Sequence, residues 1–235
     1  MLGDMNSFPD GYRALVLGAS GAIGGAIVRQ LQADTRCALV LGLHRHTQPP
    51  VDFDQEHTIA AAAAALAAQG PFDLVVNAAG VLHSARWMPE KKLDSVNYAQ
   101  MEEVFRINTL GPALVMRHFC ALLAPQRGVM VMLSAKVGSI GDNRLGGWYS
   151  YRASKAALNM LVRTAAIELA RTRPHAVLVA LHPGTVPSDL SRPFGGGGIG
   201  RQPDVAAGEM LAVIDRLTPA DTGQFVAWNG ERLPW

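Results

Sequence analysis

Tyr151 and Lys155 are the two residues whose types and spacing point most directly to chemistry. They stand four positions apart at the start of a stretch that we expect to be helical, so their side chains share one face of the helix. A free phenol titrates near about 10 and exchanges protons poorly at neutral pH. A neighbouring ammonium favours the phenolate and lowers that pKa towards the range of efficient acid–base catalysis. The pair predicts a proton-transferring tyrosine; the alternative is a surface tyrosine stacked on a lysine stem.

A glycine-rich turn in the first part of the chain could bind the phosphates of a nucleotide. The apolar run Leu15–Leu17 leads into Gly18-Ala19-Ser20-Gly21-Ala22-Ile23-Gly24 and then into a helical pattern. Strand, turn and helix in this order form the first unit of a dinucleotide-binding fold, with the pyrophosphate at the helix N-terminus. Gly18 allows the tight turn, and Gly24 lets helix and strand pack closely. The spacing is neither G-x-G-x-x-G nor a P-loop, so an ordinary glycine turn is the alternative.

Composition limits the class of protein. The 235 residues are 49% hydrophobic, without a break in composition, which indicates one domain over residues 1–235 with a sizeable core. A net charge of +2 without basic runs argues against nucleic acid as a partner. The chain lacks the apolar run of about 20 residues that a membrane span needs, and its start does not read as a secretion signal. Cys37 and Cys120 have no metal-ligand spacing. We expect a cytoplasmic protein without a metal site.

The elements that must position these residues read as an α/β fold. Continuous apolar runs, typical of strands covered on both faces, alternate with helical stretches. The predicted strands are Ala14–Leu17, Ala38–Leu43, Leu74–Val76, Val129–Leu133, Ala176–Leu181 and, as a possible edge, Gln224–Trp228. The predicted helices are Gly24–Ala33, Thr58–Gln69, Asp94–Leu123, Tyr149–Arg171 and Pro203–Arg216. This order predicts a doubly wound parallel sheet with helices on both faces.

The segment 187–203 breaks all periodicity. It contains four consecutive glycines, Gly195 to Gly198. One interpretation is a flexible linker. Because the segment follows a predicted strand end, where parallel sheets carry their binding sites, we favour a lid over a substrate site.

Four further motifs follow in a fixed order: Asn77-Ala78-Ala79-Gly80, Asn108, Ser134 and Pro183-Gly184-Thr185-Val186. Each alone is a common turn or a polar residue with a structural role. Together with the glycine turn and the Tyr151–Lys155 pair, they make the chain resemble the short-chain dehydrogenase/reductase family from about Arg13 to Trp235. Tyr149–Lys155 and Gly230–Trp235 are similar to the branch of C-factor-like proteins and Sniffer-type carbonyl reductases. The resemblance implies a single-domain Rossmann-type fold.

The resemblance also implies roles for residues. Tyr151 would protonate a carbonyl oxygen, Lys155 would lower the Tyr151 pKa and bind the nicotinamide ribose, and Asn108 would hold a water that links Lys155 to solvent. The implied cofactor-binding residues are Gly18, Ser20, Ala22, Ile23, Gly24, Asn77, Ala78, Ala79, Gly80, Tyr151, Lys155, Pro183, Gly184 and Val186.

The chain departs from the family pattern at the serine that hydrogen-bonds the substrate oxygen. The family pattern Ser-Ser-x-x-Gly reads Ser134-Ala135-Lys136-Val137-Gly138 here, which places Ala135 at the catalytic position. Neighbouring strand residues point to opposite faces, so Ser134 can substitute only at a strand end or bulge. Ser139 is the other candidate. If the site is active, Ser134 or Ser139 should lie within hydrogen-bond reach of the Tyr151 hydroxyl or of a water that both share.

The choice of cofactor rests on the end of the second predicted strand. An NAD enzyme of this fold carries a carboxylate there for the ribose 2′-hydroxyl. This chain has His44 and Arg45 instead, and Arg45 can grip a 2′-phosphate with charge-assisted hydrogen bonds. The resemblance adds Asp52, after a third strand, as the adenine contact, with Phe53 beside it. We predict NADP(H) in preference to NAD(H); the alternative for Arg45 is a solvated loop residue.

Two functions of different classes remain. The first is an NADP-dependent oxidoreductase that interconverts a small-molecule carbonyl and an alcohol. The second is a nucleotide-binding signalling or sensor protein that has lost turnover, which Ala135 supports. A sugar-nucleotide epimerase would need a substrate domain that 235 residues leave no room for. We also expect a homodimer or homotetramer, because symmetric assemblies are common and relatives pair through the two long predicted helices.

Overall fold

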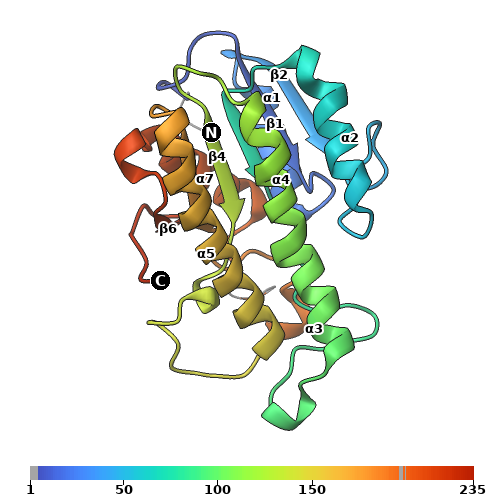
Figure 1. Cartoon of the computed structure of the whole chain (residues 1–235). Helices are drawn as coiled ribbons and strands as arrows, with labels where there is room; N and C mark the ends of the chain where they lie inside the picture. Colours follow the sequence, from blue (N-terminus) through green and yellow to red (C-terminus); the bar gives the residue numbers. More distant parts are fainter. Residues whose placement is uncertain (1–4, 196–197, 199) are drawn as a thin grey trace.

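The computed structural model describes residues 5–195, 198 and 200–235, and a six-stranded sheet lies at its centre (Figure 1). All strand pairs are parallel, in the order β2-β1-β3-β4-β5-β6. The strands are β1 (Tyr12–Leu17), β2 (Cys37–Leu43), β3 (Leu74–Asn77), β4 (Val129–Leu133), β5 (Val177–His182) and β6 (Phe225–Ala227). The central four are almost wholly buried, which explains their continuous apolar sequences.

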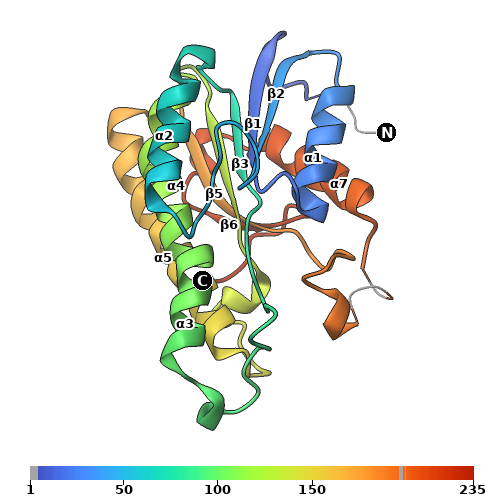
Figure 2. The same ribbon diagram turned by 90° about the vertical axis from the view of Figure 1, so that its right-hand side faces the viewer.

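Helices cover both faces of the sheet, as the alternation of patterns predicted. Figure 2 shows α1 (Ala22–Ala33) and α7 (Pro203–Arg216) on one face and α2 (Glu56–Leu66), α4 (Gly111–Phe119) and α5 (Tyr149–Thr172) on the other. Each face has its own buried apolar cluster. The α/β doubly wound fold is therefore confirmed. Within the residues described, no helix combines the length and apolar character that crossing a membrane requires.

The predicted strand before Asp52 is wrong. The sheet ends at β2, and residues 44–55 form turns in the described structure. Pro49 and Pro50 lie where that strand would pair, and a proline nitrogen carries no hydrogen to donate to a sheet ladder.

The predicted helix Asp94–Leu123 is confirmed as helical from Tyr98 to Leu122, but it is not a uniform α-helix. It divides into α3 (Tyr98–Phe105), a five-residue π-helical segment (Arg106–Leu110) and α4, with short 3₁₀ turns at either end. Pro112 lies in the first turn of α4, directly after the π segment, and has no N–H to bond back into the preceding turn. Because a π-helix has more residues per turn than an α-helix, the π segment changes the direction in which the Asn108 side chain leaves the helix.

Two glycines set the approach of α1 to the sheet. Gly18 has φ +79°, and a Cβ there would lie 2.6 Å from the Ala79 nitrogen. A Cβ on Gly24 would collide with the Gly18 carbonyl. The turn therefore requires glycine at both positions, as the sequence predicted.

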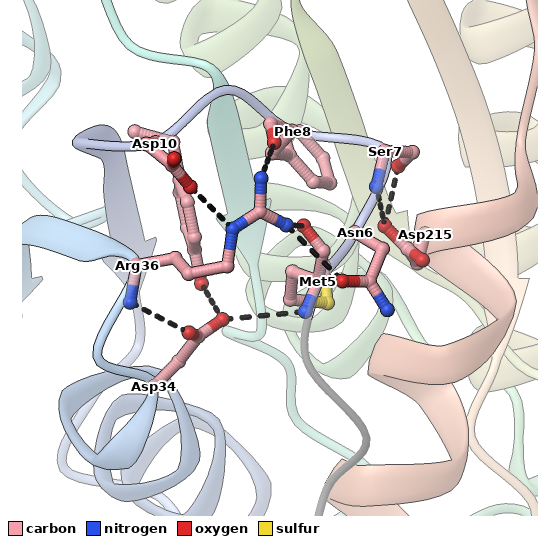
Figure 3. Close-up of polar contacts among 9 residues, drawn as sticks. Met5, Asn6, Ser7, Phe8, Asp10, Asp34, Arg36 and Asp215 are labelled. Carbon is pink, nitrogen blue, oxygen red and sulfur yellow. Dashed lines mark hydrogen bonds and ion pairs between the residues drawn. The ribbon is translucent and has the colours of Figure 1, made fainter.

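The segment before β1 is fastened to the body of the protein by a polar network (Figure 3). Asp34, at the end of α1, accepts hydrogen bonds from the Met5 amide (3.3 Å), the Tyr12 hydroxyl (2.9 Å) and the Arg36 amide (2.9 Å). The Arg36 guanidinium donates to the carbonyls of Met5 (2.9 Å) and Phe8 (2.7 Å). These bonds hold the buried Met5 and Phe8 side chains in the core cluster of α1 and α7.

We predict that Asp34→Ala lowers the free energy of unfolding by about 1–3 kcal/mol, because it leaves the buried Tyr12 hydroxyl without its acceptor. Urea unfolding measures the change. Asp10→Ala is the matched control: Asp10 also pairs with Arg36, but its side chain is 87% exposed, so about 0–1 kcal/mol is expected. Equal losses in the two variants would contradict the assignment.

Candidate active site

A cavity of about 1060 Å³ opens at the carboxyl edge of the sheet. The glycine turn, Ala78–Gly80, the first turns of α5 and Pro183–Val186 line it. Parallel strands place their carboxyl ends at one edge, so motifs that lie far apart in the sequence meet there. The size suits a nucleotide together with a small molecule.

Tyr151 and Lys155 both line this cavity and are nearly buried, with 8% and 4% of their surfaces exposed. The Lys155 Nζ donates a hydrogen bond to the Leu133 carbonyl at 2.9 Å. Burial lowers the pKa of Lys155 to about 8 and raises the pKa of Tyr151 above its ordinary value. In this arrangement the Tyr151 pKa is raised by the loss of hydration rather than lowered as expected.

Asn108 lies in the π-helical segment and is fully buried. Its Nδ2 donates to the Val81 carbonyl (2.8 Å) and to the Ser154 hydroxyl (3.1 Å), and its Oδ1 accepts from the Val81 amide (2.9 Å). A Cβ on Gly80 would lie 3.4 Å from both the Asn108 Oδ1 and the Lys155 Nζ. Asn108 thus locks the chain after Gly80 and has one atom near Lys155, although it does not line the cavity.

The two candidate serines have other partners. Ser134 lines the cavity, but its hydroxyl donates to the Asn159 Oδ1 at 2.7 Å. The Ser139 hydroxyl donates to the Trp235 carbonyl (3.3 Å) and accepts from the Asp142 amide (3.1 Å). Ala135 packs against Tyr151 instead. Among the described residues, neither serine has a direct hydrogen bond to Tyr151.

The glycine turn fits a dinucleotide. Gly21 begins α1 without a side-chain cap, and the first N–H groups of a helix have no partner inside it. They face the cavity that Ser20, Ala22, Ile23 and Gly24 line, which is the arrangement that binds a pyrophosphate. Other parts of the cavity are lined by a different set of residues. The predicted residues that line the cavity are Ser20, Ala22, Ile23, Gly24, Arg45, Ala78, Ala79, Gly80, Ser134, Tyr151, Lys155, Pro183, Gly184 and Val186.

Other predicted cofactor residues do not line the cavity: Gly18, His44, Asp52, Phe53 and Asn77. Asp52 accepts hydrogen bonds from the Asp54 amide (3.0 Å) and the Gln55 side chain (3.2 Å), so it shapes the turn before α2. The Phe53 ring packs where a Cβ on Gly111 would be. These residues have structural roles here.

Arg45 lines the cavity at the end of β2 and is exposed. Within the described residues, its guanidinium makes no hydrogen bond or ion pair, so it can bind an anion from solution. No three His, Cys, Asp or Glu side chains of the described part of the chain come together as a metal site would require.

The sequence did not single out the aromatic residues around Tyr151. The Trp148 and Phe194 rings lie 5.0 Å apart, and Trp148 lies 6.3 Å from the Tyr151 ring. His83 bonds to the Asp189 carbonyl at 2.9 Å and packs on Phe194. These contacts bring the first part of the predicted lid over Tyr151. Gly196, Gly197 and Ile199 of that lid lie outside the described residues. The one sequence signal for this region was the pair Gly146-Gly147, which precedes Trp148 and indicates an unusual turn before α5.

His182 was also missed. It ends β5 and lines the cavity, and its buried Nδ1 has no partner among the described residues. Burial, with the nearby charges of Lys136 and Arg201, lowers the pKa of His182 to about 4. The imidazole is therefore neutral at physiological pH, with one buried ring nitrogen that makes no hydrogen bond among the described residues.

Comparison with known proteins agrees with this geometry. The family model described as short chain dehydrogenase matches residues 12–195. A relative in Rhodococcus sp. (strain AD45), 1-hydroxy-2-glutathionyl-2-methyl-3-butene dehydrogenase, is 34% identical over 94% of this chain and 98% of its own. C-signal of Myxococcus xanthus is 40% identical over 71% of this chain and 94% of its own.

Two solved structures are similar over nearly the whole chain. The carbonyl reductase Sniffer of D. melanogaster has a TM-score of 0.84 at 21% identity, over 97% of this chain and 100% of its own. The NADPH-bound carbonyl reductase from chicken fatty liver has a TM-score of 0.83 at 27% identity, over 97% and 96%. The predicted resemblance to C-factor-like and Sniffer-type proteins is confirmed.

Proposed function

Because the chain belongs to the short chain dehydrogenase family, we propose that it is an NADP(H)-dependent oxidoreductase that interconverts a small-molecule carbonyl compound and an alcohol. One observation carries the proposal: the glycine turn, Arg45, Tyr151 and Lys155 line the same cavity. A phosphate-binding helix end, a cation for an additional phosphate and a buried proton donor thus share one chamber.

In the proposed reaction, Tyr151 gives its proton to the carbonyl oxygen, and the nicotinamide, when bound, supplies the hydride. The raised pKa keeps the Tyr151 phenol protonated at physiological pH, so that it holds the proton to be donated, although the phenol is a weaker acid than a tyrosine in solution. Lys155 holds its ammonium beside the site and would exchange the Leu133 carbonyl for the ribose hydroxyls. Asn108 holds the chain after Gly80 and has its Oδ1 near Lys155, where a water could carry protons to solvent.

Ser134 is the proposed donor to the developing oxyanion, in place of Ala135. It lines the cavity, whereas Ser139 does not. The Asn159 Nδ2 is buried without a partner among the described residues. Rotation of the Asn159 amide would let that Nδ2 donate to the Ser134 oxygen, and the hydroxyl proton would then be available to the substrate.

We propose NADP(H) as the preferred cofactor, bound with Arg45 at the 2′-phosphate. The absence of a carboxylate at the end of β2 supports this choice, as does the NADPH bound to the chicken carbonyl reductase. We also propose a cytoplasmic homodimer or homotetramer whose contacts include the exposed apolar residues Leu110, Met160 and Ile167 on the faces of the π-helical segment and α5. The segment 187–203 would serve as the substrate lid.

The second candidate is a nucleotide-binding signalling or sensor protein with little turnover. Two observations favour it: Ala135 stands beside Tyr151 where a hydroxyl would be needed, and the name of the Myxococcus xanthus relative describes a signal. The buried Tyr151, Lys155 and Asn108 favour the oxidoreductase, since a sensor has no need to keep all three.

Replacing Tyr151 by Phe should lower kcat by about 10²–10⁴-fold, because it removes the proton donor and leaves the cofactor site intact. The measurement is NADPH consumption with a panel of aldehydes, ketones and quinones, together with calorimetric titration of NADPH. Wild-type turnover by the variant would show that the catalytic assignment is wrong.

Arg45→Ala should weaken NADPH binding by about 10–150-fold and NADH binding little, because a charge-assisted hydrogen bond is lost only with the phosphate. Titration of both cofactors measures the difference. Arg117→Ala, an exposed arginine on α4, is the control and should change neither affinity. Tighter binding of NADH than NADPH by the parent protein would overturn the cofactor assignment.

Ala135→Ser distinguishes the two candidate functions. If Ser134 is the donor, Ser134→Ala should cost about 10²–10³ in kcat, Ser139→Ala should be neutral, and Ala135→Ser should gain little. A protein that has lost turnover would instead gain measurable activity from Ala135→Ser. Full activity in both serine-to-alanine variants would show that neither serine is the hydrogen-bond donor to the oxyanion.

A further inference from the structure

Trp148 has an unusual backbone conformation at the edge of the cavity. Its φ of 53° and ψ of 46° are left-handed, and it is the one residue other than glycine with a positive φ in the described part of the chain. A bulky side chain rarely adopts this conformation, so something must hold it. This conformation has two consequences: α5 begins at the next residue, and the indole packs on Phe194 and Tyr151.

Glu90 holds this conformation from a distant part of the chain. Its carbonyl accepts a hydrogen bond from the Trp148 amide. Its carboxylate accepts one from the Ser150 amide at 3.1 Å and one from the Ser150 hydroxyl. α5 has no side-chain cap of its own, so Glu90 supplies the acceptors that the first turn lacks. Trp148 is thereby held directly by the Glu90 carbonyl and indirectly by the bonds of the Glu90 carboxylate to Ser150.

The segment that carries Glu90 is itself fixed. Gln100, buried on α3, donates from its Nε2 to the Met88 carbonyl at 2.9 Å. Glu90 is 3% exposed and Ser150 is 1% exposed. Because Glu90 is buried and its segment is anchored to α3, it can impose a conformation on Trp148 that the local sequence disfavours.

The surroundings of the indole indicate the kind of substrate. Trp148 and Phe194 form a wall beside Tyr151, and Leu82, Ala135, Val137 and Leu190 complete an apolar pocket. Flat rings pack on such a wall edge-to-face or offset-stacked, which small aliphatic groups cannot do.

We propose that Glu90 is a positioning residue that holds Trp148 in its left-handed conformation, so that the Trp148–Phe194 wall makes the enzyme prefer flat aromatic carbonyl compounds to small aliphatic ones. The inference rests on the proposed oxidoreductase function.

The test compares kcat/KM for benzaldehyde with that for propanal, using NADPH. Glu90→Ala should lower the benzaldehyde-to-propanal ratio by about 2–10-fold, through a higher KM for benzaldehyde. Glu90→Gln should restore the ratio, because its Oε1 can accept from the Ser150 amide while its Nε2 donates to the Ser150 oxygen. Asp94→Ala, an exposed acid in the same connection, is the control and should leave the ratio unchanged.

A double-mutant cycle shows whether Glu90 acts through Trp148. Trp148→Gly accepts a left-handed backbone without strain but has no ring, so it should lower the ratio by itself. Adding Glu90→Ala to Trp148→Gly should then change the ratio no further. Independent, additive effects would overturn the proposal, as would a ratio in Glu90→Ala equal to that of the parent protein.

Hydrogen–deuterium exchange of the protein alone separates this inference from the proposed function. Glu90→Ala should speed exchange of the Ser150 amide, which loses its acceptor, and to a smaller extent that of the Trp148 amide, which keeps the main-chain carbonyl of residue 90, while the rest of α5 stays protected; Glu90→Gln should change neither. If no carbonyl compound consumes NADPH, the proposed function fails, and exchange still decides whether Glu90 is the clamp. Unchanged exchange at these amides, or faster exchange throughout the protein, would refute local positioning.

Discussion

All six strands run parallel, and the rest of the structure depends on this constraint. Parallel strands need helical crossovers on both faces, so the sheet is buried and every strand ends at the same edge. The glycine turn after β1, Ala78–Gly80 after β3 and Pro183–Val186 after β5 therefore meet around one cavity. The common direction of the strands is thus enough to bring these distant segments together at one edge of the sheet.

Burial then sets the chemistry at that edge. The same exclusion of water raises the pKa of Tyr151 and lowers the pKa of Lys155 to about 8. The phenol therefore stays protonated and is a weaker acid than a tyrosine in solution, and the ammonium loses its charge more readily than a lysine in solution. The direction of both shifts follows from burial rather than from the spacing of Tyr151 and Lys155, and around Tyr151 the buried cluster includes Ala135 and Leu82.

The sequence correctly predicted the elements that are defined by signals within their own residues, such as a proline in the first turn or a regular apolar pattern. α7 was placed from Pro203 to Arg216, as observed, because a proline in the first turn and a regular apolar pattern define it. α5 was correct to within one residue. The π-helical segment at Asn108 was missed, since hydrophobic period does not distinguish it from an α-helix, and Pro49 and Pro50 were overlooked where a strand was expected. The conformation of Trp148 was beyond prediction, because Glu90 imposes it through contacts between segments far apart in the chain.

The fastening of the first segment has a consequence for how the chain folds. Ser7 bonds through its amide to Asp215 of α7 at 2.9 Å, a contact between residues 208 positions apart. Closing so long a loop is slow, because its entropy must be lost before the contact forms. During synthesis, residues 5–10 must wait until α7 has emerged from the ribosome and docked beside α1. Met5 and Phe8, apolar and without their final neighbours, stay exposed for that interval, so the segment before β1 is protected from aggregation only after α7 has docked.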